Sequence, residues 1–107
     1  MSKYKIRFFF EWGGYCLWSA NDEARNKYGY PIEPSKLPLS KETLEKIKNM
    51  ESWYQTALDW NDPGGPSPWT REENEKFGRE AKTLLEKIIS ELGEDYEIID
   101  KMNYLKR

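Results

Sequence analysis

The residue types that most often carry catalysis are scarce in this sequence. It contains no histidine, which removes the commonest general base and the commonest metal ligand of enzymes. Cys16 is the only cysteine, so it has neither a histidine to activate it as a nucleophile nor the companion ligands of a structural zinc site. We therefore expect no catalytic residue, no metal site and no cofactor.

Carboxylate pairs and glycine pairs are the remaining candidates for chemistry. The 19 acidic residues offer many carboxylate pairs, none of them in a motif that indicates hydrolysis, and a small enzyme working through carboxylates is kept as an alternative. Gly13-Gly14 lacks the lysine–serine continuation of a phosphate-binding loop and precedes a strand pattern, which indicates a turn. The sequence favours a protein that binds a partner over an enzyme.

The segment Trp53–Glu75 is the most informative one for binding, because it combines tryptophans with carboxylates. Arg71 is the only basic residue between Asp59 and Glu75. Aromatic anchors surrounded by acids suit a basic protein partner, and a proline-rich loop lowers the ordering cost of binding. We therefore predict a partner-binding surface made by Asp59, Trp60, Asp62, Trp69, Glu72 and Glu73.

These aromatic rings also have a purely structural interpretation. Trp60 and Trp69 can clamp the loop onto the ends of the flanking helices, and one ring can do so while its neighbour faces a partner. A second pair, Trp12 and Trp18, flanks the predicted hairpin, where the rings either fill the core or stack on a sugar or nucleotide. The sequence leaves open which tryptophans are exposed.

Alternating apolar and charged residues predict strands at both ends of the chain. One strand is expected over Lys3–Trp12, and it returns after the turn as a second strand over Tyr15–Trp18. The final strand is expected over Tyr96–Met102, with Glu97 opposite Lys5 or Arg7 as a cross-strand ion pair.

Three helices are expected between the strands. A short one over Glu23–Tyr28 is capped by Asn21 or Asp22 and ended by Gly29. Two long helices then present one apolar stripe each. The first runs from Ser40 to about Trp60, and the second starts at a capping box of Thr70 with Glu73 and ends at Gly93.

A helical hairpin with apolar stripes needs a sheet to cover. The predicted fold is α/β of the α+β type, in one domain over residues 1–107. Its small, mostly antiparallel sheet is built from the N-terminal hairpin and the C-terminal strand, and two long helices cover it. A mixed sheet is the alternative, because three strands allow several topologies.

The charge distribution bears on the class of partner. The formal net charge is −2, yet residues 11–100 hold 11 basic and 19 acidic residues, which argues against a general nucleic-acid binder. We find no signal peptide and no apolar run of about 18 residues that would span a membrane. A single thiol fits a reducing compartment, so we expect a cytoplasmic protein.

Several strings resemble a group of small uncharacterised bacterial proteins that look like the immunity proteins of polymorphic toxin systems, including contact-dependent growth inhibition. The strings are Ile6–Trp12, Cys16–Trp18, Asn21-Asp22, Tyr28–Pro31, Leu37–Ser40, Leu58–Trp60 and Pro66–Trp69. The resemblance implies a cytosolic protein that binds a cognate toxin domain tightly and blocks its active site. No catalytic or binding residue carries over from it.

The acidic central segment is compatible with that implication. Toxin nucleases are usually basic, and an acidic inhibitor can mimic the phosphates of the substrate and speed association. The alternative is another protein-interaction or regulatory module, which includes a homodimer. The sequence does not fix the oligomeric state or the identity of the partner.

Overall fold

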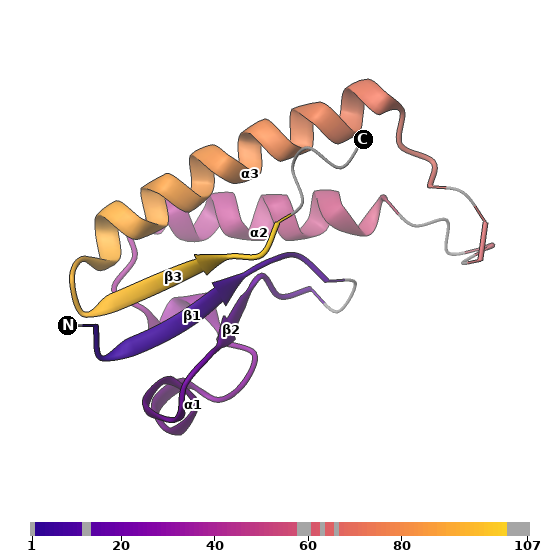
Figure 1. Cartoon of the computed structure of the whole chain (residues 1–107). Helices are drawn as coiled ribbons and strands as arrows, with labels where there is room; N and C mark the ends of the chain where they lie inside the picture. The colour runs from indigo at the N-terminus through magenta and orange to yellow at the C-terminus, as the bar shows by residue number, and fades with distance from the viewer. Residues whose placement is uncertain (1, 12–13, 58–60, 63, 66, 103–107) are drawn as a thin grey trace.

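The computed structural model of the chain describes residues 2–11, 14–57, 61–62, 64–65 and 67–102 (Figure 1). Strands lie at both ends of the chain and helices lie between them, as the sequence predicts. The elements in chain order are β1 (Tyr4–Phe8), β2 (Leu17–Ser19), α1 (Asp22–Tyr28), the 3-10 turn η1 (Pro34–Lys36), α2 (Lys41–Gln55), α3 (Arg71–Leu92) and β3 (Tyr96–Asp100).

The sheet has the strand order β2-β1-β3 and is mixed. The predicted hairpin is confirmed, since β1 and β2 pair antiparallel, whereas β1 and β3 pair parallel. The sheet is therefore less antiparallel than expected. The reason is the helical hairpin: α3 returns the chain to the end of the sheet where β1 begins, so β3 runs in the same direction as β1 (Figure 1).

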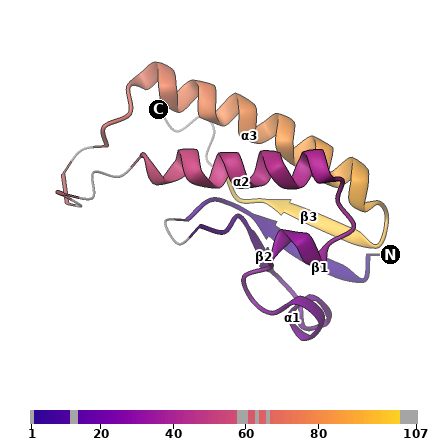
Figure 2. The same ribbon diagram turned by 180° about the vertical axis from the view of Figure 1, so that it is seen from behind.

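The two long helices lie side by side on one face of the sheet, and α1 lies beside β2 (Figure 2). This agrees with the predicted covering layer. Helix α2 ends at Gln55, earlier than the predicted end near Trp60, which lies outside the described residues. Ion pairs of 2.7 Å between Lys46 and Glu80 and of 2.5 Å between Lys87 and Glu42 join the two helices.

The core lies between the sheet and the two long helices. Tyr4, Ile6 and Phe8 alternate along β1 and are buried, which matches the period-two pattern of the sequence. Cys16, directly before β2, is also buried. The fully buried side chains that complete the core include Leu17, Ile32, Ile47, Met50, Leu84 and Ile88.

The predicted helix caps form. The side chain of Asn21 accepts a hydrogen bond from the Ala24 N–H at 3.0 Å, and Ser40 caps α2 by accepting from the Thr43 N–H at 3.1 Å. Glu91, near the end of α3, accepts from the hydroxyl of Thr43 at 2.6 Å and from the N–H of Ser40 at 2.7 Å. The start of α2 is thereby tied to the end of α3.

Glu51 is a half-buried carboxylate on the inner side of α2. It borders a cleft of about 580 Å³ together with Glu33, and its Oε2 atom has no hydrogen-bond partner among the described residues. Burial, helped by the Glu33 carboxylate, raises the pKa of Glu51 to about 7, against a smaller opposing effect of a hydrogen bond with Cys16. The pKa of the Cys16 thiol is raised too, first by burial and then by the negative charge of the Glu51 carboxylate.

The raised pKa of Glu51 predicts a pH-dependent stability. The folded state favours the protonated form of Glu51. The stabilising contribution of that form is complete below about pH 4.5 and is lost as the pH rises through about 7. Glu51→Gln mimics the neutral acid. We therefore expect its free energy of unfolding, relative to that of the wild type, to be about 1 kcal/mol larger at pH 8 than at pH 5. Urea unfolding at both pH values measures this, with exposed Glu86→Gln as the control. An equal pH dependence in wild type and Glu51→Gln would contradict it.

The buried hydroxyl of Thr43 gives a second prediction. Thr43→Val keeps the shape of the side chain but removes the donor to Glu91, so we expect a loss of about 1–2 kcal/mol in the free energy of unfolding. Thr83→Val is the matched control, because the Thr83 hydroxyl is exposed and donates only to the Arg79 carbonyl of its own helix. Thermal or urea unfolding of both variants decides, and an equal loss in the two would refute a special role for Thr43.

Candidate partner-binding surface

Five aromatic side chains meet where α2 ends and α3 begins, and we call them the aromatic cluster. The ring of Phe77 lies at its centre, with centroids 5.0 Å from Phe10, 4.9 Å from Trp53, 5.6 Å from Tyr54 and 5.0 Å from Trp69. Only Phe77 and Phe10 are buried, and the other three rings are half-buried against the core. The cluster joins both long helices to the end of β1.

Trp69 belongs to this cluster and fixes the end of the loop that leads into α3. Its indole N–H donates to the hydroxyl of Thr56 at 2.7 Å, and its backbone N–H donates to the hydroxyl of Ser67 at 3.2 Å. The Ser67 hydroxyl in turn donates to the Ala57 carbonyl at 2.5 Å. Trp69 therefore clamps the loop onto the helix ends, as in the structural interpretation of the sequence, and part of its ring remains accessible.

Trp53 holds one of the predicted acidic residues in place. Its indole N–H donates to the Glu73 carboxylate at 3.0 Å, while the Glu73 N–H donates to the Thr70 hydroxyl at 3.1 Å. The predicted Thr70 cap is thus present, but the described partner of the Glu73 side chain is an indole on α2. Glu73 is fixed at both its backbone and its side chain.

The other acids lie in the first turns of α3 and in the loop that precedes it. Glu72 and Asp62 are exposed, and Glu75 forms a 3.4 Å ion pair with Arg71. Asp62 belongs to a tight turn, since its carbonyl accepts from the Gly65 N–H at 3.0 Å.

Two shallow hollows border these residues. A groove of about 550 Å³ runs along the first turns of α3 and is lined by Trp53, Glu72 and Glu73 together with Lys76 and Arg79. A cleft of about 590 Å³ lies on the other side of Trp69, between α3 and the ends of the strands. Glu72, Glu73 and Glu75 therefore border concave surface rather than a flat helix face.

The structure locates four of the six predicted surface residues, namely Asp62, Trp69, Glu72 and Glu73. Glu72 and Glu73 line one groove, and Trp69 contacts Trp53 in the wall of that groove at 5.8 Å between ring centroids. Asp59 and Trp60 lie outside the described residues. The sequence did not assign Trp53 as the residue that orients Glu73, because a contact between residues 20 positions apart has no local signal.

The second aromatic site predicted near the hairpin contains Trp18 together with three aromatic residues that the sequence did not single out for it. Trp18 stacks on Phe9 at 5.1 Å between centroids, and its indole N–H donates to the Phe9 carbonyl at 3.0 Å. Tyr15 and Tyr30 contact the same indole. Trp12 lies outside the described residues. Phe9, Tyr15 and Trp18 are half-buried and Tyr30 is exposed. The rings pack on one another, which fits a structural role.

Two classes of site find no support in the described part of the chain. No group of three or more metal-ligating side chains occurs there. None of its helices combines the length and the apolar character that a membrane span requires.

Comparison with known proteins identifies the family. A search of curated proteins found no match to the chain. Residues 4–101, which include every described helix and strand, match the family model described as Serratia CdiI immunity protein-like. The chain therefore belongs to the Serratia CdiI immunity protein-like family.

Proposed function

We propose that this protein is an immunity protein that binds a cognate bacterial toxin domain and neutralises it. We further infer that it acts in the cytoplasm and catalyses no reaction. Family membership supports the general class. We further propose that the partner is basic and that it docks on the surface of Asp59, Trp60, Asp62, Trp69, Glu72 and Glu73. The position of the last four residues around one end of the helical hairpin supports this choice.

The observation that carries the proposal is the fixed carboxylate of Glu73. Its hydrogen bond to the Trp53 indole removes much of the side-chain entropy that a free glutamate loses on binding. The adjacent carboxylate of Glu72 is exposed, and Asp62 adds a further exposed carboxylate in the loop that precedes α3. A preorganised acidic rim suits a cationic site on a partner, because charge complementarity speeds encounter and fixes orientation.

Two of these acidic residues also stabilise the fold. Glu72 and Glu73 lie in the first turn of α3, where carboxylates interact favourably with the partial positive charge of the helix N-terminus. That interaction does not require Asp62, which belongs to the preceding turn. Charge reversal at Asp62 leaves this interaction intact, whereas charge reversal at Glu72 removes it at a cost of about 1 kcal/mol, so thermal unfolding of the variant accompanies the binding test.

The double substitution Asp62→Lys with Glu72→Lys should weaken toxin binding. We expect the dissociation constant to rise at least about tenfold, mainly through slower association and with a weaker dependence on salt. Binding to the purified cognate toxin domain by surface plasmon resonance at two salt concentrations measures this. Growth of cells that produce the toxin domain reports protection in parallel.

The control for this experiment is Glu45→Lys with Glu86→Lys, which changes the net charge equally at exposed positions in the middle of α2 and α3. It should keep nearly wild-type affinity. If both double variants bind like the wild type, the acidic surface is wrongly assigned even though the protein still neutralises the toxin. If the wild type neither binds nor protects, the proposed function itself fails.

A second experiment separates the charge of Glu73 from its orientation. Glu73→Gln keeps an acceptor for the Trp53 indole and removes the charge, so we expect weaker toxin binding. The melting temperature should fall only slightly, through the lost interaction with the helix N-terminus. Trp53→Phe keeps the Glu73 charge but removes the hydrogen bond that orients it. We expect weaker binding together with about 1 kcal/mol lower stability. Calorimetric titration and thermal unfolding give both quantities. Wild-type affinity in Glu73→Gln would exclude this carboxylate from the interface.

A further inference from the structure

One edge of the sheet is covered and the other is open. The outer edge of β2 is occupied by the segment that follows α1, because the Ser19 N–H donates to the Tyr30 carbonyl and the Ile32 N–H donates to the Leu17 carbonyl, both at 2.8 Å. On the opposite side, β3 is the last strand of the sheet. Among the described residues, no segment pairs with its outer edge.

The backbone groups on that edge follow from the strand register. The Asp95 carbonyl accepts from the Tyr4 N–H at 2.9 Å, and the Lys101 N–H donates to the Phe8 carbonyl at 3.0 Å. Odd-numbered residues of β3 therefore direct their backbone groups toward β1, and even-numbered ones direct them outward. The Tyr96 N–H is used in the turn with Gly93, which leaves Ile98 and Asp100 to offer both groups at the edge.

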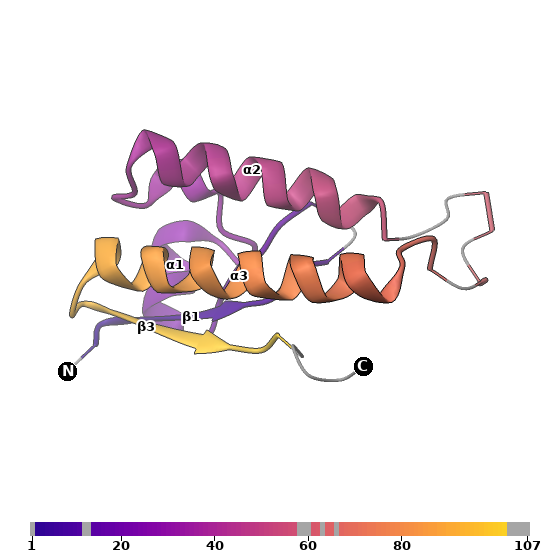
Figure 3. The ribbon, with the colours of Figure 1, turned by 90° about the horizontal axis from the view of Figure 1, so that it is seen from above.

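An exposed apolar side chain flanks the same edge. Ile89 is 47% exposed, one of two large hydrophobic residues that are exposed among those described. Lys87 and Glu91 of α3 bond to residues of α2 and its cap, and Ile89 lies two residues from each, so it faces the opposite flank of the helix. Figure 3 shows β3 on that flank of α3, away from α2.

We propose that the partner of this edge is a second copy of the chain, paired through β3 in antiparallel orientation about a two-fold axis at Ile98. In that register Ile98 meets its own counterpart, and Tyr96 meets Asp100. The outward backbone groups of Ile98 then face those of its counterpart, and the Tyr96 carbonyl faces the Asp100 N–H of the other copy, as in an antiparallel ladder. The two Ile89 side chains approach the axis from the two α3 helices and lose solvent exposure.

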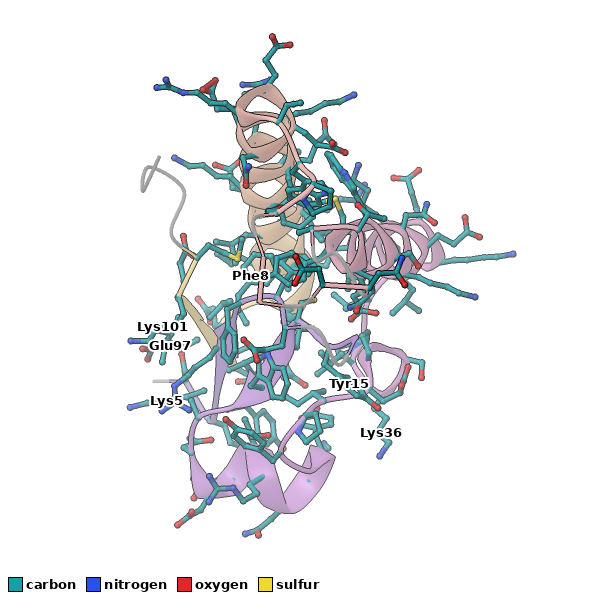
Figure 4. All side chains as sticks on the ribbon, turned by 90° about the vertical axis from the view of Figure 1, so that its right-hand side faces the viewer. Lys5, Phe8, Tyr15, Lys36, Glu97 and Lys101 are labelled. Atoms are coloured by element: carbon teal, nitrogen blue, oxygen red, sulfur yellow. The ribbon has the colours of Figure 1, made fainter. Side chains whose placement is uncertain are left out.

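The charges on the edge complement one another in the same register. Asp95 of one copy lies opposite Lys101 of the other, and the symmetry produces this pair twice. Figure 4 shows Lys5, Glu97 and Lys101 on the outer side of the sheet, where such pairs remain near solvent, while Phe8 lies between the sheet and the helices. Opposite charges at facing strand positions stabilise pairing modestly, and like charges there oppose it. This self-complementarity favours a second copy over an unrelated strand.

The proposal is tested on the full-length protein alone. Sedimentation velocity over a concentration series should show a reversible monomer–dimer equilibrium with a dissociation constant on the order of 10 μM, as suits a small interface. Ile89→Lys alters only an exposed side chain and should raise that constant at least about tenfold. Thermal unfolding of each variant checks that the fold is intact.

Charge exchange supplies the sharper test. Lys101→Asp places two acids opposite each other and should raise the dissociation constant about tenfold, whereas Asp95→Lys with Lys101→Asp should restore it to within about threefold of the wild type. Failure of the double variant to recover, or a dimer that none of these changes weakens, overturns the proposed register. A wild-type monomer at every concentration overturns the proposal. If Ile89→Lys then weakens toxin binding instead, the edge belongs to the toxin.

Discussion

The packing of four aromatic rings around Phe77 is the constraint on which the proposed binding end of this molecule depends. Helices α2 and α3 are joined here by a long connection, whose described residues form no helix or strand. The rings of Trp53 and Tyr54 come from α2, Trp69 comes from the loop, and Phe10 follows β1. Removal of the central ring would therefore release all of these segments together, including the carboxylate that Trp53 orients.

This arrangement reconciles the two interpretations of the tryptophans. A tryptophan has an apolar body and a polar N–H, so one ring can pack into a cluster while its donor fixes a surface group. Trp69 uses its donor on Thr56 and thereby holds the loop, whereas Trp53 uses its donor on Glu73 and thereby holds a charge. The clamp and the acidic surface are parts of one structure, and the rigidity of the surface follows from the clamp.

Local patterns predicted the elements well, and the structure departs from them where distant contacts decide. The caps at Asn21, Ser40 and Thr70 and the buried alternation in β1 are short-range features that a sequence displays directly. The parallel pairing of β3 depends on how the helical hairpin returns the chain, which no local pattern encodes. The same holds for the candidate site: its acids were visible in the sequence, but their orientation by an indole on another helix was not.

Helix α3 connects the two proposed surfaces and separates them in space. Its 22 residues span about 33 Å, with the acidic turn at the N-terminal end and Ile89 near the C-terminal end. Because β3 starts beside the C-terminal end of α3 (Figure 1), a two-fold axis at Ile98 lies away from the acidic turn. The two copies of α3 would run antiparallel across that axis and carry their acidic ends in opposite directions. Pairing through the edge would thus leave both toxin-binding surfaces accessible, so a dimer could hold two toxin domains without conflict.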